Sequence, residues 1–249
     1  MAAEPETWRV LGASVRGSSH VQRGVECQDA HAIRILGDSR FVLAVADGAG
    51  SAKHSAEGAS TAAAAVADYI AHRLSETSPE NEADCAEILR SAHAHASARL
   101  EALADGDRAL SDFATTLLIC FVDGPWLGVA SIGDGAIVLN ACDNLVLLQP
   151  DCKGEYLNET DFVTSAAGTE RMLVDVRTSA RVTGIAMFTD GVEWAAIQYK
   201  EHLPHARFFE PLFKQAADAG ASDIDEFLSS QRFCEQTDDD KTLVLAVKI

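Results

Sequence analysis

The sequence contains no long apolar run. None of its apolar stretches reaches the roughly 18 to 20 residues that a membrane-spanning helix requires. The first residues, MAAEPETWRV, also lack the basic start and the apolar core of a secretory signal. These absences argue against a membrane partner and predict a soluble cytoplasmic protein.

Positive charge is scarce. The 249 residues include 20 Lys and Arg against 38 Asp and Glu, so the formal net charge is −18. A field of that sign repels the phosphates of nucleic acids, which argues against nucleic acid as a partner. If the protein handles any other anionic substrate, it needs local positive charge, either from a basic pocket or from bound metal ions.

Paired cysteine spacings and several catalytic motifs are also missing. The six cysteines are Cys27, Cys85, Cys120, Cys142, Cys152 and Cys234. Their scattered positions predict neither a disulfide framework nor a zinc site. No cysteine has an arginine at the spacing of a cysteine-phosphatase loop, and the chain has no complete P-loop, His-Glu-x-x-His or Gly-x-Ser-x-Gly motif. The corresponding chemistries are therefore disfavoured.

No linker or low-complexity tract divides the chain. Apolar residues make up 47% of it, which is ample for a sizeable core. We therefore expect residues 1–249 to form a single domain.

Short apolar runs that alternate or are rich in β-branched residues predict strands where Gly, Asp or Ser bounds them. They cover residues 8–15, 31–36, 40–46, 113–122, 125–133, 136–141, 144–149, 182–189 and 242–249. Residues near 150–180 are expected to be irregular. Helices are expected at 55–76 and 81–106, and around 204–219 and 222–233.

The predicted strands come in blocks that pairs of helices separate. This order favours an α+β fold over a doubly wound parallel sheet, in which single helices would alternate with strands. We expect a four-layer αββα sandwich of two antiparallel sheets with helices on both outer faces. The alanine-rich face of residues 60–74 is expected to pack closely on a sheet, and His93 and His95 are expected at the surface.

Asp47, Asp134 and Asp190 each end an apolar run and are each followed by glycine. Asp-Gly is a favoured hairpin turn, and for Asp134 a hairpin is expected because a predicted strand follows it. This explanation is weaker at Asp47 and Asp190, where the following residues open a helix or a small-residue loop.

The alternative is that several strand ends meet at one edge of the sandwich. Asp47, Asp190 and an acid of the stretch TDDDKTLVLAV would then surround a common point. Crowded carboxylates repel one another unless cations lie between them. Oxygen ligands select Mg²⁺, Mn²⁺ or Ca²⁺ over zinc, and a glycine after the aspartate lets a backbone carbonyl approach an ion.

The stretches CQDA, VADGAGS, FATTLL, SIGDG, FTDG and DDDKTLVLAV occur in this order. Together they resemble the metal-dependent protein phosphatases of type 2C, the PPM family, especially its small bacterial members. The resemblance runs from about Gly12 to Val247 and so covers nearly the whole chain. It implies two Mn²⁺ or Mg²⁺ ions, with a third, looser ion in bacterial members.

The resemblance also implies roles for individual residues. The bridging aspartate and the neighbouring glycine carbonyl of the family match Asp47 and Gly48. Its later metal-binding aspartates match Asp190 and Asp240, the second of which precedes Lys241 where the family usually has Asn.

Two further acids match the family. Asp29 matches an outer ligand that reaches the metal through water, and Asp134 matches the aspartate that helps to hold the third ion. With the ions in place, the family's mechanism presents a metal-activated water to the phosphoryl group, which makes Asp47 and Asp190 catalytic through the metals they hold.

The chain departs from the family at two positions. Gly24 stands where the family has its phosphate-binding arginine, so that His20 or the neighbouring Arg23 is left to substitute, and His20 ranks first. Ala49 replaces the histidine that is a proposed general acid in eukaryotic members. His54 is a candidate for that proton, although a solvated histidine near a helix start explains it equally well.

The stretch between Asp134 and Asp190 is shorter than the family pattern, which predicts a reduced flap beside the site. The leading hypothesis is hydrolysis of phosphoserine and phosphothreonine in proteins that a cognate kinase has phosphorylated. One alternative is a phosphatase-like regulatory or binding module with weak or no turnover, which the missing arginine and histidine motivate. Another is a metal-dependent hydrolase of small phosphate compounds.

Overall fold

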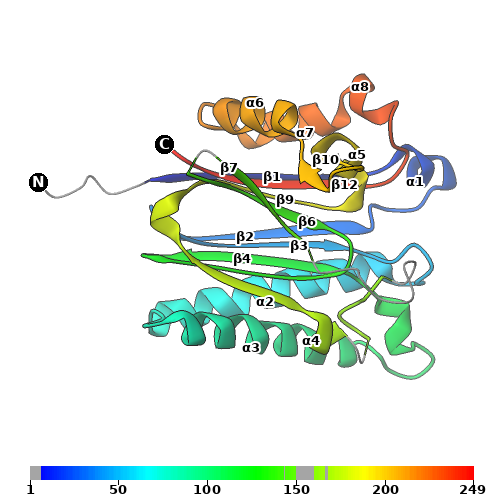
Figure 1. Cartoon of the computed structure of the whole chain (residues 1–249). Coiled ribbons are helices and arrows are strands. Elements are labelled where there is room, and N and C mark those ends of the chain that lie inside the picture. The colour runs from blue at the N-terminus through cyan, green and yellow to red at the C-terminus, as the bar shows by residue number, and fades with distance from the viewer. Residues whose placement is uncertain (1–6, 143, 150–159, 166–167) are drawn as a thin grey trace, which may run out of the picture.

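The protein folds into four layers (Figure 1). Its computed structural model describes residues 7–142, 144–149, 160–165 and 168–249. Two antiparallel sheets pack face to face, and helices cover the outer face of each sheet. The expected α+β sandwich of antiparallel sheets and helices is confirmed.

The first sheet has the order β2-β3-β4-β5-β8. Its strands are Asp29–Gly37 (β2), Arg40–Asp47 (β3), Leu117–Asp123 (β4), Trp126–Ile132 (β5) and Leu173–Thr178 (β8). The alanine-rich helix Ser55–Glu76 (α2) and helix Glu82–Glu101 (α3) cover its outer face (Figure 1). The expected close packing on the sheet is confirmed, since the alanines of α2 between residues 59 and 67 are mostly buried and α2 contacts β2, β3 and β4.

The second sheet has the order β1-β12-β9-β6-β7. Its strands are Trp8–Val15 (β1), Lys241–Lys248 (β12), Val182–Phe188 (β9), Ala136–Ala141 (β6) and Asn144–Leu148 (β7). A small ladder pairs Ile197–Gln198 (β10) with Leu203–Pro204 (β11). The helices on this side are Asp190–Ala196 (α5), Ala206–Ala216 (α6), Ala221–Ser229 (α7) and Gln231–Cys234 (α8). The chain also forms the short helices Ser18–Arg23 (α1) and Gly168–Arg171 (α4).

Apolar side chains from both sheets meet in the centre of the sandwich. Leu43 of β3, Val129 of β5 and Val244 of β12 are all fully buried there. This packing fixes the two sheets relative to each other, and with them the strand ends that form one edge of the molecule.

The connection through Asp134 is not the expected hairpin. β5 pairs with β4 and β8 in the first sheet, whereas β6 pairs with β7 and β9 in the second. Residues 133–135 therefore carry the chain from one sheet to the other. The Asp-Gly pair that does lie in a hairpin is Asp123-Gly124, where β4 turns into β5 and Gly124 has a φ of +57°.

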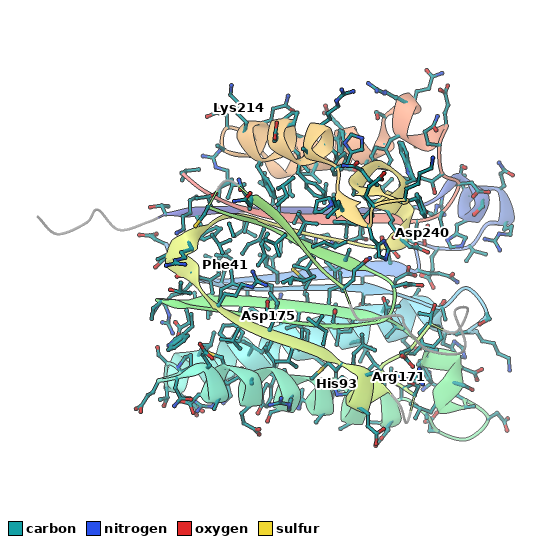
Figure 2. All side chains as sticks on the ribbon, in the orientation of Figure 1. Phe41, His93, Arg171, Asp175, Lys214 and Asp240 are labelled. Atoms are coloured by element: carbon teal, nitrogen blue, oxygen red, sulfur yellow. The ribbon has the colours of Figure 1, made fainter. Side chains whose placement is uncertain are left out.

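His93 is buried, which contradicts its expected place at the surface. Only 2% of it is exposed, because it lies on the face of α3 that also buries Leu89, Ala92 and Ala96 (Figure 2). His95 is exposed as expected, and its ring stacks on Tyr69.

Several element boundaries also differ from expectation. Residues 110–113 form a short 3₁₀ helix, so β4 begins only at Leu117. β8 lies in the stretch that was expected to be irregular, and the helix expected at 222–233 is divided between α7 and α8. The predicted reduced flap falls largely on residues 150–159, which lie outside the described residues. Among the helices that the structure describes, none has both the length and the apolar content to cross a bilayer.

The inter-sheet core gives a stability prediction. Leu43→Ala removes a fully buried side chain from between the sheets and should lower the free energy of unfolding by about 2–5 kcal/mol. Urea denaturation followed by circular dichroism measures the change. Ile35→Ala is the control, because Ile35 on the neighbouring β2 is 60% exposed and its loss should change stability by less than about 0.5 kcal/mol. Equal losses in the two variants would contradict this account of the core.

Candidate metal centre

A cavity of about 220 Å³ opens at one edge of the sandwich, where β3 and β9 end and β12 begins. Asp240, labelled in Figure 2, lies at this edge. The described residues that line the cavity include the carboxylates of Asp47, Asp134, Asp190, Asp239 and Asp240, together with His20, Gln28, Gly48, Thr116 and Thr160. The acids that end separate apolar runs in the sequence therefore face one space.

Asp47 is the last residue of β3, and two threonines hold its backbone. Its N–H donates to Thr116 Oγ1 at 3.0 Å, and its carbonyl accepts from Thr116 N at 2.8 Å and from Thr115 Oγ1 at 2.9 Å. These bonds occupy the main chain of Asp47 and leave its carboxylate directed to the cavity. They give the FATTLL stretch a structural role beside the site.

The glycines after Asp47 and Asp190 are required by close backbone packing. A Cβ on Gly48 would lie 2.6 Å from Ser55 O and 2.8 Å from Gln28 O. A Cβ on Gly191 would lie 1.9 Å from Asp240 O. The backbone thus crowds both glycines, and Gly48 also lines the cavity.

Asp29 lies behind the cavity and is 7% exposed. It faces Asp47 across the β2–β3 ladder, and its Oδ2 accepts from Thr189 Oγ1 at 2.7 Å. Burial raises its pKa to about 8, although hydrogen bonds from Thr189 and Thr242 act in the opposite direction. It is not among the described residues that line the cavity, and its expected role as an outer ligand stays a prediction.

Burial and mutual repulsion raise the pKa values of the central carboxylates. The pKa of Asp47 is raised to about 10, first by burial and then by the charges of Asp29, Asp190, Asp134 and Asp239. The pKa of Asp190 is raised to about 6 by burial and by Asp134 and Asp239. The carboxylates cannot all be ionised near neutral pH unless positive charge is brought in.

That positive charge is not supplied by the described part of the cavity wall, which contains no lysine or arginine. Within the described residues, no three His, Cys, Asp or Glu side chains are placed to hold an ion by themselves. The carboxylates surround a volume instead. This arrangement fits hard divalent ions such as Mg²⁺, which keep several waters and bind through one or two carboxylates.

Asp240 is bound tightly to the N-terminal part of the chain. Its Oδ1 accepts from Gly17 N at 2.6 Å, and its Oδ2 accepts from Gln28 N at 2.5 Å and from His20 Nδ1 at 2.8 Å. It is 3% exposed. These donors engage both carboxylate oxygens of Asp240, so the residue has a structural task whether or not it contacts an ion.

The motif match did not identify the neighbouring Asp239 as a site residue. It is exposed, lines the cavity and raises the pKa values of Asp47 and Asp190. In the described structure its carboxylate accepts one hydrogen bond, from Asp240 N at 2.9 Å. The run of three acids at 238–240 was the available signal, but spacing alone does not tell which acid faces the cavity.

Asp134 and His20 are both brought to the cavity. Asp134 Oδ2 accepts from Thr160 Oγ1 at 2.9 Å, and the preceding Gly133 has a φ of +98°, a left-handed value that favours glycine. His20 is 6% exposed, and its Nδ1 is held by Asp240.

Two candidates are not brought to the cavity. Arg23 is exposed and donates from Nε to Ser19 O at 3.2 Å. His54 precedes α2 and stacks on Phe113, with ring centroids 5.3 Å apart. It lines a separate pocket with Lys53 and is absent from the described wall of the acidic cavity, so its expected role as a proton donor has no geometric support.

A family model described as protein phosphatase 2C matches residues 16–229. The chain is 33% identical over 253 residues to serine/threonine-protein phosphatase 3 of Escherichia coli (strain K12), and this match covers 97% of the chain and 98% of that protein.

Solved structures share the fold. The catalytic domain of the serine threonine protein phosphatase PstP, solved in complex with two manganese ions, has a TM-score of 0.62 at 18% identity, with 98% of this chain and 100% of that one covered. The serine/threonine phosphatase Stp1 from Staphylococcus aureus has a TM-score of 0.61 at 14% identity, with 96% and 94% covered.

The raised pKa values predict how pH affects the metal-free protein. Asp190, Asp29 and Asp47 have folded-state pKa values of about 6, 8 and 10, each above that of an unfolded aspartate. The folded state therefore binds more protons, and the free energy of unfolding should fall as pH rises from about 4, near the pKa of an unfolded aspartate, to about 10. Urea denaturation in the presence of EDTA measures this slope, which should be shallower in Asp47→Asn.

Divalent ions should restore the stability that the metal-free protein loses as pH rises. At a concentration one hundred times its dissociation constant, Mn²⁺ should stabilise the folded protein by about 2.7 kcal/mol per site at pH 8. Asp47→Asn should gain much less. An identical pH slope and an identical Mn²⁺ response in the two proteins would show that the carboxylates do not act as one charged cluster.

Proposed function

The chain belongs to the protein phosphatase 2C family, and from that premise we propose that it hydrolyses phosphoserine and phosphothreonine in proteins with the help of Mn²⁺ or Mg²⁺. One observation carries the proposal. Separate strand ends bring Asp47, Asp134, Asp190 and Asp239 to a single cavity whose described wall contains no lysine or arginine. Such a cavity accepts a phosphoryl group only when divalent ions are bound.

The residues of the site divide into proposed metal ligands and residues that position those ligands. Asp47, the carbonyl of Gly48, Asp190 and Asp239 are proposed to hold two ions, and Asp134 to help to hold a third. Bound there, the ions would supply an activated water and offset the charge of the phosphoryl group. Thr115 and Thr116 fix the backbone of Asp47, while Asp29 and Thr189 support the strand ends from behind.

Asp239 replaces Asp240 in this assignment. Asp240 already accepts from Gly17, Gln28 and His20, whereas Asp239 is exposed to the cavity. We assign to Asp240 the task of positioning the N-terminal loop. Through that loop it also positions His20, whose ring lines the cavity.

His20 is proposed to bind the phosphoryl group in place of the arginine that the family has at the position of Gly24. Asp240 engages Nδ1, so that Nε2 is the ring nitrogen free to serve a substrate. A protonated ring would donate from Nε2 to a phosphoryl oxygen. Arg23 does not share this position, because its guanidinium bonds to Ser19.

The same proposal specifies the substrate, its source and the place where the protein acts. The substrate is a phosphorylated protein, and a cognate serine/threonine kinase would produce it. We also propose that residues 1–249 act as one domain in the cytoplasm.

The central activity prediction concerns Asp47 and Asp190. Asp47→Asn and Asp190→Asn should each lower kcat/KM on a phosphothreonine peptide at least about a hundredfold, a loss of about 2.7 kcal/mol of transition-state stabilisation. Phosphate release in Mn²⁺ measures it. Asp68→Asn is the control, because Asp68 is an exposed acid that pairs with Arg34 on the outer surface.

Two results would count against the proposal. Full activity in the Asp47 and Asp190 variants would remove the metal mechanism. If the unaltered protein bound Mn²⁺ but left phosphopeptides intact, a regulatory module without turnover would replace the enzyme, and faster turnover of small phosphate compounds would point to a different substrate class.

A second prediction separates Asp239 from Asp240. Asp239→Asn should weaken Mn²⁺ binding and activity while leaving the urea midpoint almost unchanged, because its side chain is exposed. Asp240→Asn should lower the free energy of unfolding by about 1.5–3 kcal/mol, because a charged acceptor of several donors is lost. Calorimetric Mn²⁺ titration and urea denaturation measure the two effects. The opposite pattern would return the ligand role to Asp240.

A further inference from the structure

A second cavity lies among α5, α6, α7 and α8, on the outer side of the second sheet. Its volume is about 690 Å³, which falls within the roughly 300–1,000 Å³ of small-molecule sites. None of its described lining residues also lines the acidic cavity. It therefore needs an explanation of its own.

Aromatic rings form much of the wall. Trp194 of α5 meets Phe233 of α8 edge to face, with centroids 5.0 Å apart. Phe233 meets Phe227 of α7 at 5.3 Å, and Phe227 lies 6.1 Å from Phe208 of α6. This connected set of rings lines the cavity, and Phe227 is 37% exposed. A planar ring could stack or pack edge to face against it.

The charge of the wall is opposite to that of the protein. The chain has 38 Asp and Glu, yet none is among the described residues that line this cavity. The lining includes His205, Arg207 and Arg232 instead. In the described structure neither guanidinium has an ion pair or a hydrogen bond, whereas Arg40 at the other side of the molecule pairs with Asp123.

Two ring nitrogens in the wall have no partner. Trp194 Nε1 and His205 Nδ1 are buried from water and make no hydrogen bond within the described structure. Buried polar atoms are nearly always paired, and one that is not calls for an explanation such as an absent ligand. A ligand with polar atoms that entered between these rings would pair with Trp194 Nε1, which donates, and with His205 Nδ1, whose donor or acceptor role depends on the tautomer.

We propose that this cavity binds a small organic anion that carries an aromatic or heteroaromatic ring. The ring packs against Trp194, Phe227 and Phe233, and the anionic group pairs with Arg207 and Arg232, which are well suited to oxyanions because guanidinium groups donate in a planar fork. The cavity volume lies in the range of pockets that hold one such molecule.

Binding to the second cavity can be tested without measuring phosphatase activity. α5 begins at Asp190 in the acidic cavity and reaches Trp194 one turn later in the second cavity. A sulfonate probe is therefore preferable to a phosphate ester, because the proposed reaction cannot hydrolyse it and EDTA can be present throughout. Failure of the proposed hydrolysis would leave this measurement unaffected.

Anilinonaphthalene sulfonate is the probe, and its fluorescence titration and calorimetry give the dissociation constant. The double variant Arg207→Glu/Arg232→Glu should weaken binding at least about tenfold, since each tenfold step corresponds to the loss of about one charged hydrogen bond. Arg90→Glu/Arg99→Glu on α3 is the matched control, because it makes the same change in net charge on exposed arginines of the opposite layer. Its binding should stay within about twofold of the unaltered protein.

Ring dependence is tested with methanesulfonate, which has the charge without the ring and should show no competition with the probe. Equal weakening in the two double variants, or equal binding by methanesulfonate, would overturn the proposal. It would also be overturned if the probe failed to bind while an acidic peptide with an aromatic residue bound, since the cavity would then serve a protein partner. Circular dichroism confirms that each variant is folded.

Discussion

Asp29 and Asp47 face each other across neighbouring strands, and the charges of Asp134, Asp190 and Asp239 add to the repulsion at the same edge. The fold does not relieve this repulsion with cationic side chains in the described wall. It holds Asp29, Asp134 and Asp240 with threonine hydroxyls and backbone amides, which fix a carboxylate without cancelling its charge. This unrelieved charge is the physical basis for proposing a divalent-ion site in the cavity.

The rigidity of that edge comes from close packing of backbone on backbone. Gly48 and Gly191 leave no room for a side chain, and Gly17 packs equally closely on the backbone of Asp238 and Asp239. Asp240 then binds the loop of Gly17 to the start of β12. A small movement of any one of these segments would move several carboxylates together, so the arrangement behaves as a unit.

The sequence was informative wherever one local pattern had one structural meaning. Alternation and alanine spacing predicted the two sheets and α2, and motif order placed Asp47 and Asp190 at one site. The sequence was less informative where the same local pattern occurs in two different tertiary structures. The Asp-Gly pair at Asp134 has the signature of a hairpin but crosses between sheets, and only the packing of α3 reveals that His93 points inward. The choice between Asp239 and Asp240 depends on donors that lie more than two hundred residues away in the sequence.

β12 lies between β1 and β9 in the interior of its sheet, although it comes last among the described strands. A chain that is still being translated exposes its earlier segments first. Asp47, Asp134 and Asp190 would thus leave the ribosome well before residues 239–248 could close the remaining wall. The order of synthesis would leave the wall of the acidic cavity incomplete until this strand has emerged and inserted between its neighbours.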